Sequence, residues 1–289
     1  MNRRPCVAYV IGAVLAISST TAVAAPEKVR FSSLDQGADG KPLVLDGYWH
    51  RPAGRVRFPA VVMLHGCSGA LSKSGKITER FATMAQLLVD AGYGVLLVDS
   101  FNPRGTREIC TTARNRRQIQ PEHRWRDAYG ALHYLSNRPD VVPEKIGAIG
   151  FSHGATAAIQ VVDQRLMTAH ASGRRFAASI AFYPGCSDVL KQSSRFATQV
   201  PLLVLAGQLD DWTPVEPCER LAARSRGQGE PTELVVYPNA YHGFDSTAPV
   251  RVRTDVWGGQ RPVHVGGDAP ARADAYRRVR EFFGRHLGA

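Results

Sequence analysis

The 289-residue sequence lacks the features of fibrous and disulfide-stapled chains. Its five cysteines are too few for a small disulfide scaffold. The composition also excludes a collagen-like chain and a pure coiled coil, and no repeat of solenoid length is present. Aromatic residues are not scarce, because eleven Phe, nine Tyr and four Trp are spread along the chain. They argue for a packed interior rather than for disorder.

Acidic residues are few relative to basic ones. The chain has 25 Asp and Glu against 36 Lys and Arg, and its formal net charge is +11. Such a balance raises the question of nucleic-acid binding, and the densest basic run lies at residues 104–126. That run carries no nucleic-acid motif, is interrupted by Glu108 and Glu122, and is followed directly by Asp127. We interpret it as a solvated surface or a rim that attracts carboxylates, and expect no nucleic-acid partner.

A long apolar run is present only at the beginning of the chain. Arg3 and Arg4 precede the apolar residues 7–17, and residues 22–24 read Ala-Val-Ala, a small-residue cleavage site. The run is too short to span a bilayer comfortably. We therefore predict a signal peptide at residues 1–24, export to the periplasm or beyond, and no membrane attachment after cleavage. The alternative is an uncleaved anchor.

Four cysteines remain after such a cleavage, and their number is even. An even number suits an oxidising compartment, where disulfides persist. Three pairings are possible from the sequence alone. The four residues are Cys67, Cys110, Cys186 and Cys218.

Short β-rich runs alternate with helical patterns throughout residues 25–289. The alternation predicts a mostly parallel sheet of about eight strands with helices on both faces. No linker rich in Pro, Gly or Ser divides the chain, so we expect one domain over residues 25–289. The expected strands are 29–34, 43–49, 60–64, 94–98, 145–150, 179–183, 202–205 and 233–236, and the expected helices are 77–91, 122–137, 155–167 and 271–287.

Residues 150–154 read Gly-Phe-Ser-His-Gly between an apolar strand and an Ala-rich helix. In this context the pattern is typical of a nucleophile elbow, a tight strand-to-helix turn that exposes a serine. Small residues are needed on both sides of the serine, because larger side chains would collide with neighbouring backbone. The motif predicts Ser152 as a catalytic nucleophile.

A serine nucleophile needs a base that takes its proton and an acid that orients the base. His242 follows the last expected strand, which is the usual place for the base, and His264 in an irregular loop is its main rival. The acid is expected after the strand at 202–205, where Asp210 and Asp211 are adjacent candidates.

A serine hydrolase also needs backbone N–H groups that stabilise the negative oxygen of the tetrahedral intermediate. One donor is usually the residue after the nucleophile, here His153. The other is expected on the glycine-containing loop after the third strand, residues 65–69, where Cys67 is the candidate. These two residues form the expected oxyanion hole.

The motifs together resemble the dienelactone hydrolase family of the α/β-hydrolase superfamily, in a secreted form. The resemblance lies in residues 63–69, 99–105, 150–154, 207–210 and 241–244. It implies an α/β-hydrolase fold and hydrolysis of a small ester or lactone through an acyl-enzyme, with no cofactor and no metal. The recurring pattern of Gly-x-x-Asp with proline four residues later selects Asp210 over Asp211.

The resemblance bears on three further features. The fold places the third strand beside the fourth and the sixth beside the seventh, which implies the disulfides Cys67–Cys110 and Cys186–Cys218. The enzyme that gives the family its name uses cysteine where Ser152 stands and holds a substrate carboxylate with arginines. Arg104 approximately matches one of these arginines and is a weak candidate for substrate binding. Dienelactone itself is therefore not the expected substrate.

The leading interpretation is a serine hydrolase of carboxylic esters or lactones. The alternatives are a peptidase or acyltransferase of the same fold, and a non-catalytic exported binding protein with a basic face. The segment at residues 245–270 is either a lid or a surface excursion.

Overall fold

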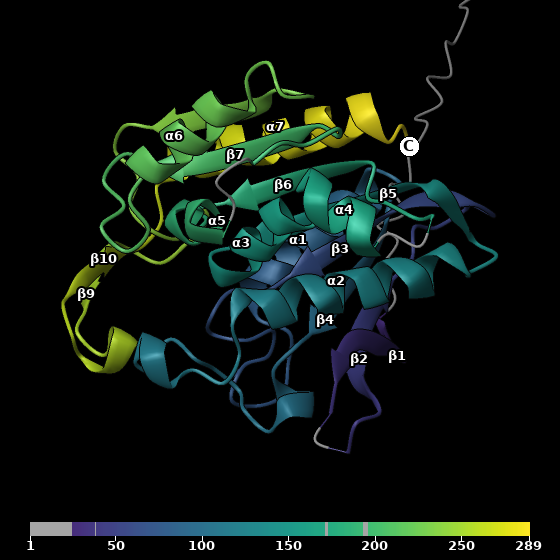
Figure 1. Ribbon diagram of the computed structural model, residues 1–289, viewed down its shortest axis with the longest axis horizontal. Helices are drawn as coiled ribbons and strands as arrows, with labels where there is room; N and C mark the ends of the chain where they lie inside the picture. The colour runs from purple at the N-terminus through teal and green to yellow at the C-terminus, as the bar shows by residue number, and fades with distance from the viewer. Residues whose placement is uncertain (1–24, 38, 171–172, 193–195) are drawn as a thin grey trace, which may run out of the picture.

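The computed structural model describes residues 25–37, 39–170, 173–192 and 196–289, and the expected signal peptide lies outside them. No helix within these ranges is both long and apolar enough to cross a membrane. Eight strands form one twisted sheet in the order β1-β2-β4-β3-β5-β6-β7-β8 (Figure 1). Their bounds are β1 Glu27–Gln36, β2 Pro42–His50, β3 Phe58–Leu64, β4 Gly94–Asp99, β5 Val141–Phe151, β6 Ala178–Phe182, β7 Leu202–Gly207 and β8 Thr232–Tyr237.

The sheet is mostly parallel, as the alternating pattern predicted. Strand β1 runs antiparallel to β2, and β2 antiparallel to β4, whereas every other neighbouring pair is parallel. The central strands are apolar throughout because both of their faces are covered. In β3, for example, Val62 packs into the core on one face and Val61 into the core on the other.

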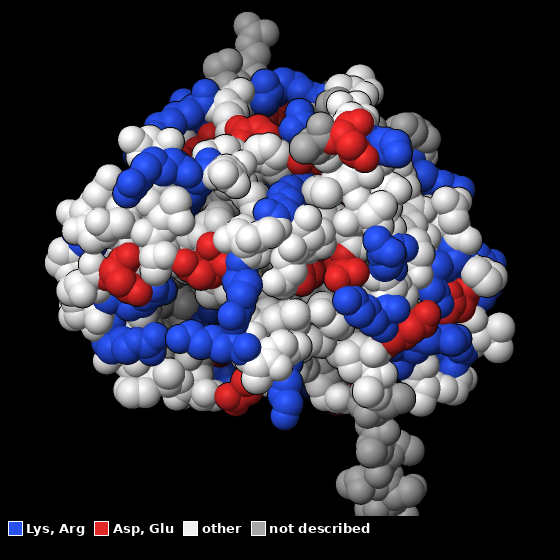
Figure 2. Space-filling view, turned by 90° about the horizontal axis from the view of Figure 1, so that it is seen from below, with Lys and Arg blue, Asp and Glu red and all other residues white. Residues whose placement is uncertain are grey.

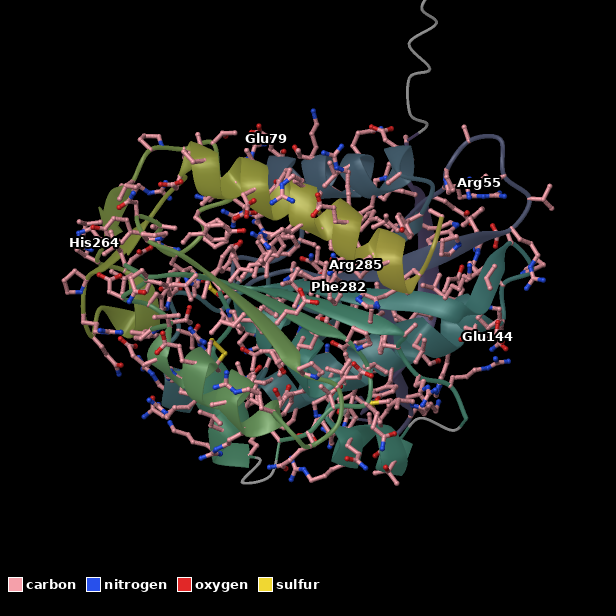
Figure 3. The ribbon with its side chains drawn as sticks, turned by 90° about the horizontal axis from the view of Figure 1, so that it is seen from above. Arg55, Glu79, Glu144, His264, Phe282 and Arg285 are labelled. Atoms are coloured by element: carbon pink, nitrogen blue, oxygen red, sulfur yellow. A yellow bond between two sulfur atoms is a disulfide. The ribbon has the colours of Figure 1, made fainter. Side chains whose placement is uncertain are left out.

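Helices cover the sheet on both faces. Helices α1 and α7 lie side by side on one face, and α2 to α6 pack on the other (Figure 3). The helices are α1 Glu79–Asp90, α2 Pro121–Ser136, α3 His153–Gln160, α4 Gln164–His170, α5 Cys186–Gln192, α6 Glu216–Ser225 and α7 Ala269–His286. The two short helices α5 and α6 were not predicted from the sequence.

The single helix expected at residues 155–167 is two helices, and that expectation was wrong. Helix α3 ends at Gln160, and α4 starts at Gln164. Between them, the Asp163 carboxylate accepts a hydrogen bond from the backbone N–H of Arg165 at 3.0 Å. An aspartate that binds backbone N–H groups just ahead of it favours the start of a new helix over continuation of the old one.

The parallel strands end at a common edge of the sheet. Leu64 is in register with Gly150, Phe151 with Phe182, and Phe182 with Leu205. The loops that follow β3, β5, β6 and β7 therefore begin next to one another, although they are far apart in sequence. Ligand sites of open α/β sheets lie at this carboxyl edge.

Two disulfides tie these loops together. Cys67 is bonded to Cys110, and Cys186 is bonded to Cys218. These are the two pairings that the family resemblance implied. The first bond joins the loop after β3 to the loop after β4, and the second joins α5 to α6.

The segment at residues 245–270 contains a small hairpin apart from the main sheet. Strands β9 (Arg251–Arg253) and β10 (Val263–Val265) pair antiparallel and extend from one end of the molecule (Figure 1). The connection between them docks on the loop after β4, because the N–H of Trp257 donates to the carbonyl of Cys110 at 2.9 Å. His264 lies on β10, not in the irregular loop expected from the sequence.

Candidate active site

The serine of the Gly-Phe-Ser-His-Gly motif stands on a strained turn between β5 and α3. Ser152 has φ 52° and ψ −115°, a conformation that a residue with a side chain rarely adopts. A Cβ added to Gly150 would lie 2.2 Å from the carbonyl oxygen of Gly154, and one added to Gly154 would lie 2.3 Å from that of Leu64. Both flanking glycines are therefore required by close backbone packing. This turn presents the Ser152 hydroxyl at the carboxyl edge of the sheet.

The structure brings three distant side chains together at this edge. The Oγ of Ser152 lies 2.9 Å from Nε2 of His242. The Nδ1 of the same imidazole lies 2.8 Å from Oδ2 of Asp210. Asp210 and His242 are buried. The contacts form one chain from carboxylate to imidazole to hydroxyl, the geometry that lets a serine transfer its proton to a histidine.

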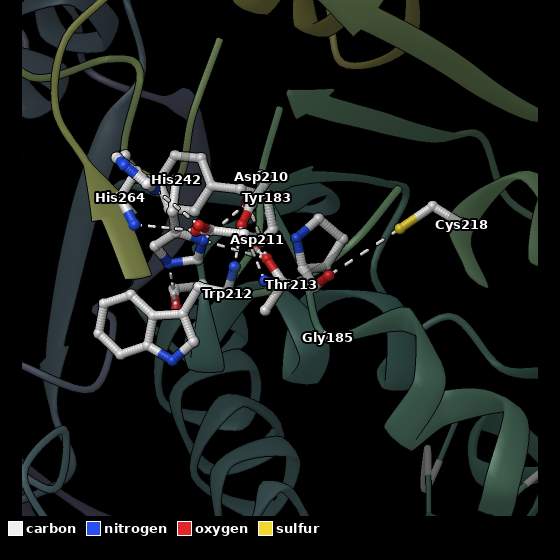
Figure 4. Close-up of polar contacts among 12 residues, drawn as sticks. Tyr183, Gly185, Asp210, Asp211, Trp212, Thr213, Cys218, His242 and His264 are labelled. Atoms are coloured by element: carbon white, nitrogen blue, oxygen red, sulfur yellow. Dashed lines mark hydrogen bonds and ion pairs between the residues drawn. The ribbon is translucent and has the colours of Figure 1, made fainter. Parts of the chain in front are cut away.

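The Asp210 carboxylate is held by its own loop. Its Oδ1 accepts hydrogen bonds from the backbone N–H groups of Trp212 and Thr213 at 2.9 and 2.8 Å. The hydroxyl of Thr213 donates to Oδ2 at 2.9 Å and lies 3.0 Å from Nδ1 of His242 (Figure 4). These donors hold the carboxylate in the orientation that faces His242. Sequence reasoning did not single out Thr213, although it lies three residues after the acid.

The rival candidates from the sequence form a separate pair. Oδ2 of Asp211 lies 2.8 Å from Nδ1 of His264, and the backbone N–H of His264 donates to Oδ1 at 2.9 Å (Figure 4). The His264 ring also stacks on Tyr241. The structure thus joins Asp211 to the β9–β10 hairpin and Asp210 to His242.

The loop after β3 lies directly against the elbow. A Cβ on Gly66 would be 3.3 Å from the carbonyl oxygen of Phe151. The His65 side chain fixes the conformation of this loop. Its Nε2 accepts a hydrogen bond from the N–H of Ser100 at 3.2 Å, and its Nδ1 lies 2.7 Å from the Gly66 carbonyl oxygen. His153 is the first residue of α3, so its backbone N–H has no partner within the helix. Cys67 and Ser152 line the same hollows beside this loop.

Two histidines next to the site are held in the neutral form. Burial lowers the pKa of His65 well below its ordinary value, and the nearby Arg124 charge lowers it further. Burial and the charges of Arg124 and Arg117 likewise lower the pKa of His153. Neither imidazole therefore gains a proton in the neutral pH range.

The pocket in front of Ser152 has a volume of about 190 Å³ and no carboxylate among its lining residues. Its walls include three arginines, Arg80, Arg251 and Arg253, together with Trp212 and Val265. Arg80 is neutralised by the buried Asp245 at 3.0 Å, and Arg253 by the exposed Asp255. Because β9 and β10 contribute to this lining, the segment at residues 245–270 forms one wall of the pocket. A smaller recess of about 30 Å³ adjoins Ser152 on the side of His153.

Arg104 is not among the residues that line this pocket, and its expected contact with substrate is not supported. Its guanidinium donates to both oxygens of Asp127 at 2.8 Å and to Asp35 at 2.8 Å. Two carboxylates therefore already occupy its donors. The interpretation of residues 104–126 as a solvated surface is also wrong in part, because Arg124 is fully buried.

Many of the other basic residues lie at the surface. Figure 2 shows Lys and Arg side chains dispersed over one face and interrupted by acidic and uncharged residues. Within the described ranges, no group of three or more His, Cys, Asp or Glu side chains is arranged to hold a metal ion.

Comparison with known families gives one match that covers most of the chain. The model of the dienelactone hydrolase family matches residues 45–287. A putative carboxymethylenebutenolidase of Synechocystis sp. is 23% identical over 248 residues, which is 85% of this chain and 93% of that protein.

A second relative is longer. The uncharacterized peptidase YuxL of Bacillus subtilis is 23% identical over 263 residues, which is 80% of this chain but only 37% of that protein. The chain thus spans little more than a third of this relative.

Among solved structures, the fold is similar to that of P91, a dienelactone hydrolase-like promiscuous phosphotriesterase from metagenomic libraries. The TM-score is 0.65 at 20% identity, and the match covers 92% of this chain and all of that one. At 20% identity, the similarity between the two structures concerns the fold alone.

Proposed function

The chain belongs to the dienelactone hydrolase family, and we propose that it is a serine hydrolase that cleaves a carboxylic ester or lactone of a small molecule. The observation that carries the proposal is the contact chain from Asp210 through His242 to Ser152, with distances of 2.8 and 2.9 Å. A protein that only binds a ligand does not need these three side chains in this arrangement. The carboxylate-free pocket in front of Ser152 is the proposed substrate site.

In the first half of the reaction, Ser152 Oγ attacks the carbonyl carbon of the ester, and its proton moves to Nε2 of His242. Asp210 stabilises the imidazolium and keeps Nδ1 protonated. The carbonyl oxygen becomes an anion that accepts hydrogen bonds from the N–H groups of Cys67 and His153. When the tetrahedral intermediate collapses, the bond to the alcohol oxygen breaks, and His242 returns its proton to that oxygen. The products are an acyl-enzyme and the alcohol.

In the second half, a water molecule replaces the alcohol. His242 takes a proton from this water as its oxygen attacks the acyl carbon. Collapse of the second intermediate breaks the bond to Ser152 Oγ, which receives the proton from His242. The carboxylic acid leaves, and the enzyme is restored. With a lactone, the alcohol and the acid are two ends of one product.

Labelling with a fluorophosphonate probe and turnover of short-chain p-nitrophenyl esters test the proposal together. Wild-type protein should react with the probe at Ser152 and hydrolyse the esters, and Ser152→Ala should do neither. Ester turnover that survives in Ser152→Ala would place the chemistry elsewhere. A folded wild-type protein inert to probe and esters would instead favour a binding function.

A peptidase is the second candidate, because one relative is described as a peptidase. An amine is a poorer leaving group than an alcohol, so the same triad would have to protonate the leaving nitrogen of the amide. Aminoacyl p-nitroanilides and the matching p-nitrophenyl esters separate the two activities. A kcat/KM for anilides equal to or above that for esters would favour the peptidase.

We also propose that residues 1–24 are a cleaved export signal and that residues 25–289 act as one domain. The disulfides Cys67–Cys110 and Cys186–Cys218 support an oxidising compartment, since such bonds are rare in the cytosol. N-terminal sequencing of the periplasmic or secreted protein should give Ala25 as the first residue. A mature protein that still begins at Met1 would contradict the proposal.

A further inference from the structure

Helix α2 places a guanidinium in the interior behind the candidate active site. Arg124 has a relative exposure of 0%, and its Nε has no hydrogen-bond partner among the residues that the structure describes. Asp127, which follows Arg124 by three residues on the same helix, is bonded to Arg104 and Ser33 instead. Arg124 forms no ion pair with a carboxylate of the described residues. The charges of Asp127 and Asp99 act on Arg124, but neither carboxylate bonds to it directly. Burying a charge that has no directly bonded partner costs several kcal/mol of stability, so a role for this arginine beyond folding needs to be considered.

The two contacts of Arg124 lie in two different parts of the site. One terminal nitrogen donates to the backbone carbonyl of His65 at 2.8 Å. The other lies 3.2 Å from Nδ1 of the His153 ring. The guanidinium also lies over the ring of Phe101, 5.0 Å from its centroid. One side chain thus joins the loop after β3 to the first residue of α3.

These two segments carry the N–H groups assigned to the oxyanion hole. The His65 carbonyl is two residues before Cys67, whose N–H is one donor, and His153 supplies the other. The distance between the donors depends on how the loop sits against the elbow. Because shifts of about 1 Å in a catalytic group lower rates about 100-fold, a contact that fixes this distance affects the rate directly.

The contact also fixes the tautomer of His153. Arginine has only N–H donors, so Nδ1 must accept and the ring proton must lie on Nε2. A protonated ring would place two N–H groups against each other. Burial and the Arg124 charge lower the pKa of His153, which agrees with a neutral ring. Burial lowers the pKa of Arg124 itself to about 10, so it stays positively charged near neutral pH.

We propose that Arg124 is a positioning residue that holds the two halves of the oxyanion hole at their working separation. The proposal rests on the proposed serine hydrolase function. Arg124 contacts neither substrate nor Ser152; it acts through the His65 carbonyl and the His153 ring. Its positive charge lies behind the backbone donors, where it also favours negative charge on the substrate oxygen.

The test compares Arg124→Lys and Arg124→Gln with wild type on p-nitrophenyl butyrate. Lysine keeps the charge, but its single ammonium group cannot bond to both the His65 carbonyl oxygen and His153 Nδ1. Glutamine removes the charge. We expect kcat to fall about 10- to 100-fold in each variant, with KM within about threefold of wild type. The Ki of a trifluoromethyl ketone, which forms a tetrahedral anion on serine, should rise by the same factor as kcat/KM falls.

Leu132→Ala is the matched control, because Leu132 is a fully buried residue of the same helix with no part in the site. It should lower the melting temperature and leave kcat and Ki within about twofold of wild type, since a cavity alone does not change transition-state binding. A folded Arg124→Gln that keeps wild-type kcat and Ki overturns the proposal. The same holds if the Arg124 variants lose activity only in proportion to lost folded protein.

A measurement on wild type covers the case in which Arg124→Gln does not fold. Nitrogen-15 NMR of labelled histidine should show the His153 ring neutral at pH 7, with its proton on Nε2. A proton on Nδ1, or a charged ring, overturns the proposal. Fluorophosphonate labelling separates this outcome from a failure of the proposed function: an unlabelled wild type that hydrolyses no ester refutes the hydrolase, whereas a labelled wild type with unaffected Arg124 variants refutes only the role of Arg124.

Discussion

Asp211 and His264 hold each other through two hydrogen bonds, one from the ring and one from the backbone of His264. The preceding residue, Asp210, binds His242 in the same way that a triad acid binds its base. Adjacent aspartates thus have different partners: one contacts the imidazole next to Ser152, and the other anchors the hairpin that walls the pocket.

This division predicts different effects for two matched substitutions. Asp210→Asn should lower kcat about 10³- to 10⁴-fold, because the amide no longer stabilises the imidazolium or the correct tautomer. Asp211→Asn should leave kcat within about tenfold and act mainly on KM, since it loosens a pocket wall and touches no reacting atom. Steady-state kinetics on one ester measures both. The reverse ranking would assign the acid role to Asp211.

The flanking glycines of the elbow give a second prediction. In Gly154→Ala the new methyl group would lie 2.3 Å from the Leu64 carbonyl oxygen. The turn must shift, at a cost of about 1 to 3 kcal/mol of unfolding free energy, and with a large loss of kcat. Chemical denaturation and ester kinetics check the two effects.

Gly284→Ala is the control for this substitution. Apart from the backbone of its own helix, an added Cβ at this exposed position of α7 meets no atom of the described residues within 4 Å. Alanine should therefore stabilise the protein by about 0.5 to 1 kcal/mol through its helix propensity, with unchanged kcat. Equal changes in the free energy of unfolding and in kcat for Gly154→Ala and Gly284→Ala would contradict the packing argument for Gly154.

The two disulfides are expected to contribute similarly to stability but differently to activity. They close loops with sequence separations of 43 and 32 residues, so the chain-entropy model gives each about 4 kcal/mol at most. Replacing Cys67 and Cys110 by alanine should also lower kcat, because Cys67 carries a proposed oxyanion donor. Replacing Cys186 and Cys218 should lower the melting temperature with little change in kcat. A loss of kcat confined to the second variant would argue against the placement of the oxyanion hole.

Acid should destabilise the protein through its buried neutral histidines. The pKa values of His65 and His153 are lowered well below 6.5 by burial and by Arg124. In the unfolded chain both rings take up protons near pH 6.5, so the unfolded state binds more protons on the acid side. The free energy of unfolding is therefore unaffected by protonation of these two rings above pH 6.5. It decreases as the pH falls from 6.5 towards their pKa in the folded protein. The slope reaches about 1.4 kcal/mol per pH unit for each histidine.

Urea denaturation of wild type and His65→Gln at pH 7, 6 and 5 measures this dependence. The variant should be less stable at pH 7 but should lose stability less steeply with acid, because one proton-binding difference has been removed. If the free energy of unfolding falls equally steeply with pH in wild type and in His65→Gln, His65 is not a source of the acid destabilisation.

Much of the fold follows from short-range pattern. The apolar run at residues 60–64 predicted a strand, and β3 is a strand that is buried on both faces. The break between α3 and α4 was missed because alanine, isoleucine and valine continue the helical pattern, whereas one local contact of Asp163 interrupts it.

The charged residues show where pattern was insufficient. Arg104 and Arg124 occur in one basic run, and the run was interpreted as surface. In the structure Arg104 binds Asp127 and Asp35, and Arg124 is enclosed between the loop after β3 and α3. Nothing in the run separates these two arginines from exposed neighbours such as Arg107, because the burial of a side chain depends on what the remote elements place over it.

The amino-acid order alone was enough for the strand and helix alternation, for the serine between its two glycines, and for a histidine after the last strand. These features depend on residues close in the chain, whose steric and hydrophobic requirements are visible in sequence. Which aspartate meets which histidine, which arginine is buried, and what walls the pocket became known only in three dimensions. Those outcomes depend on distances of a few ångströms between residues that are 32 to 163 positions apart in the chain, and only the packed chain sets such distances.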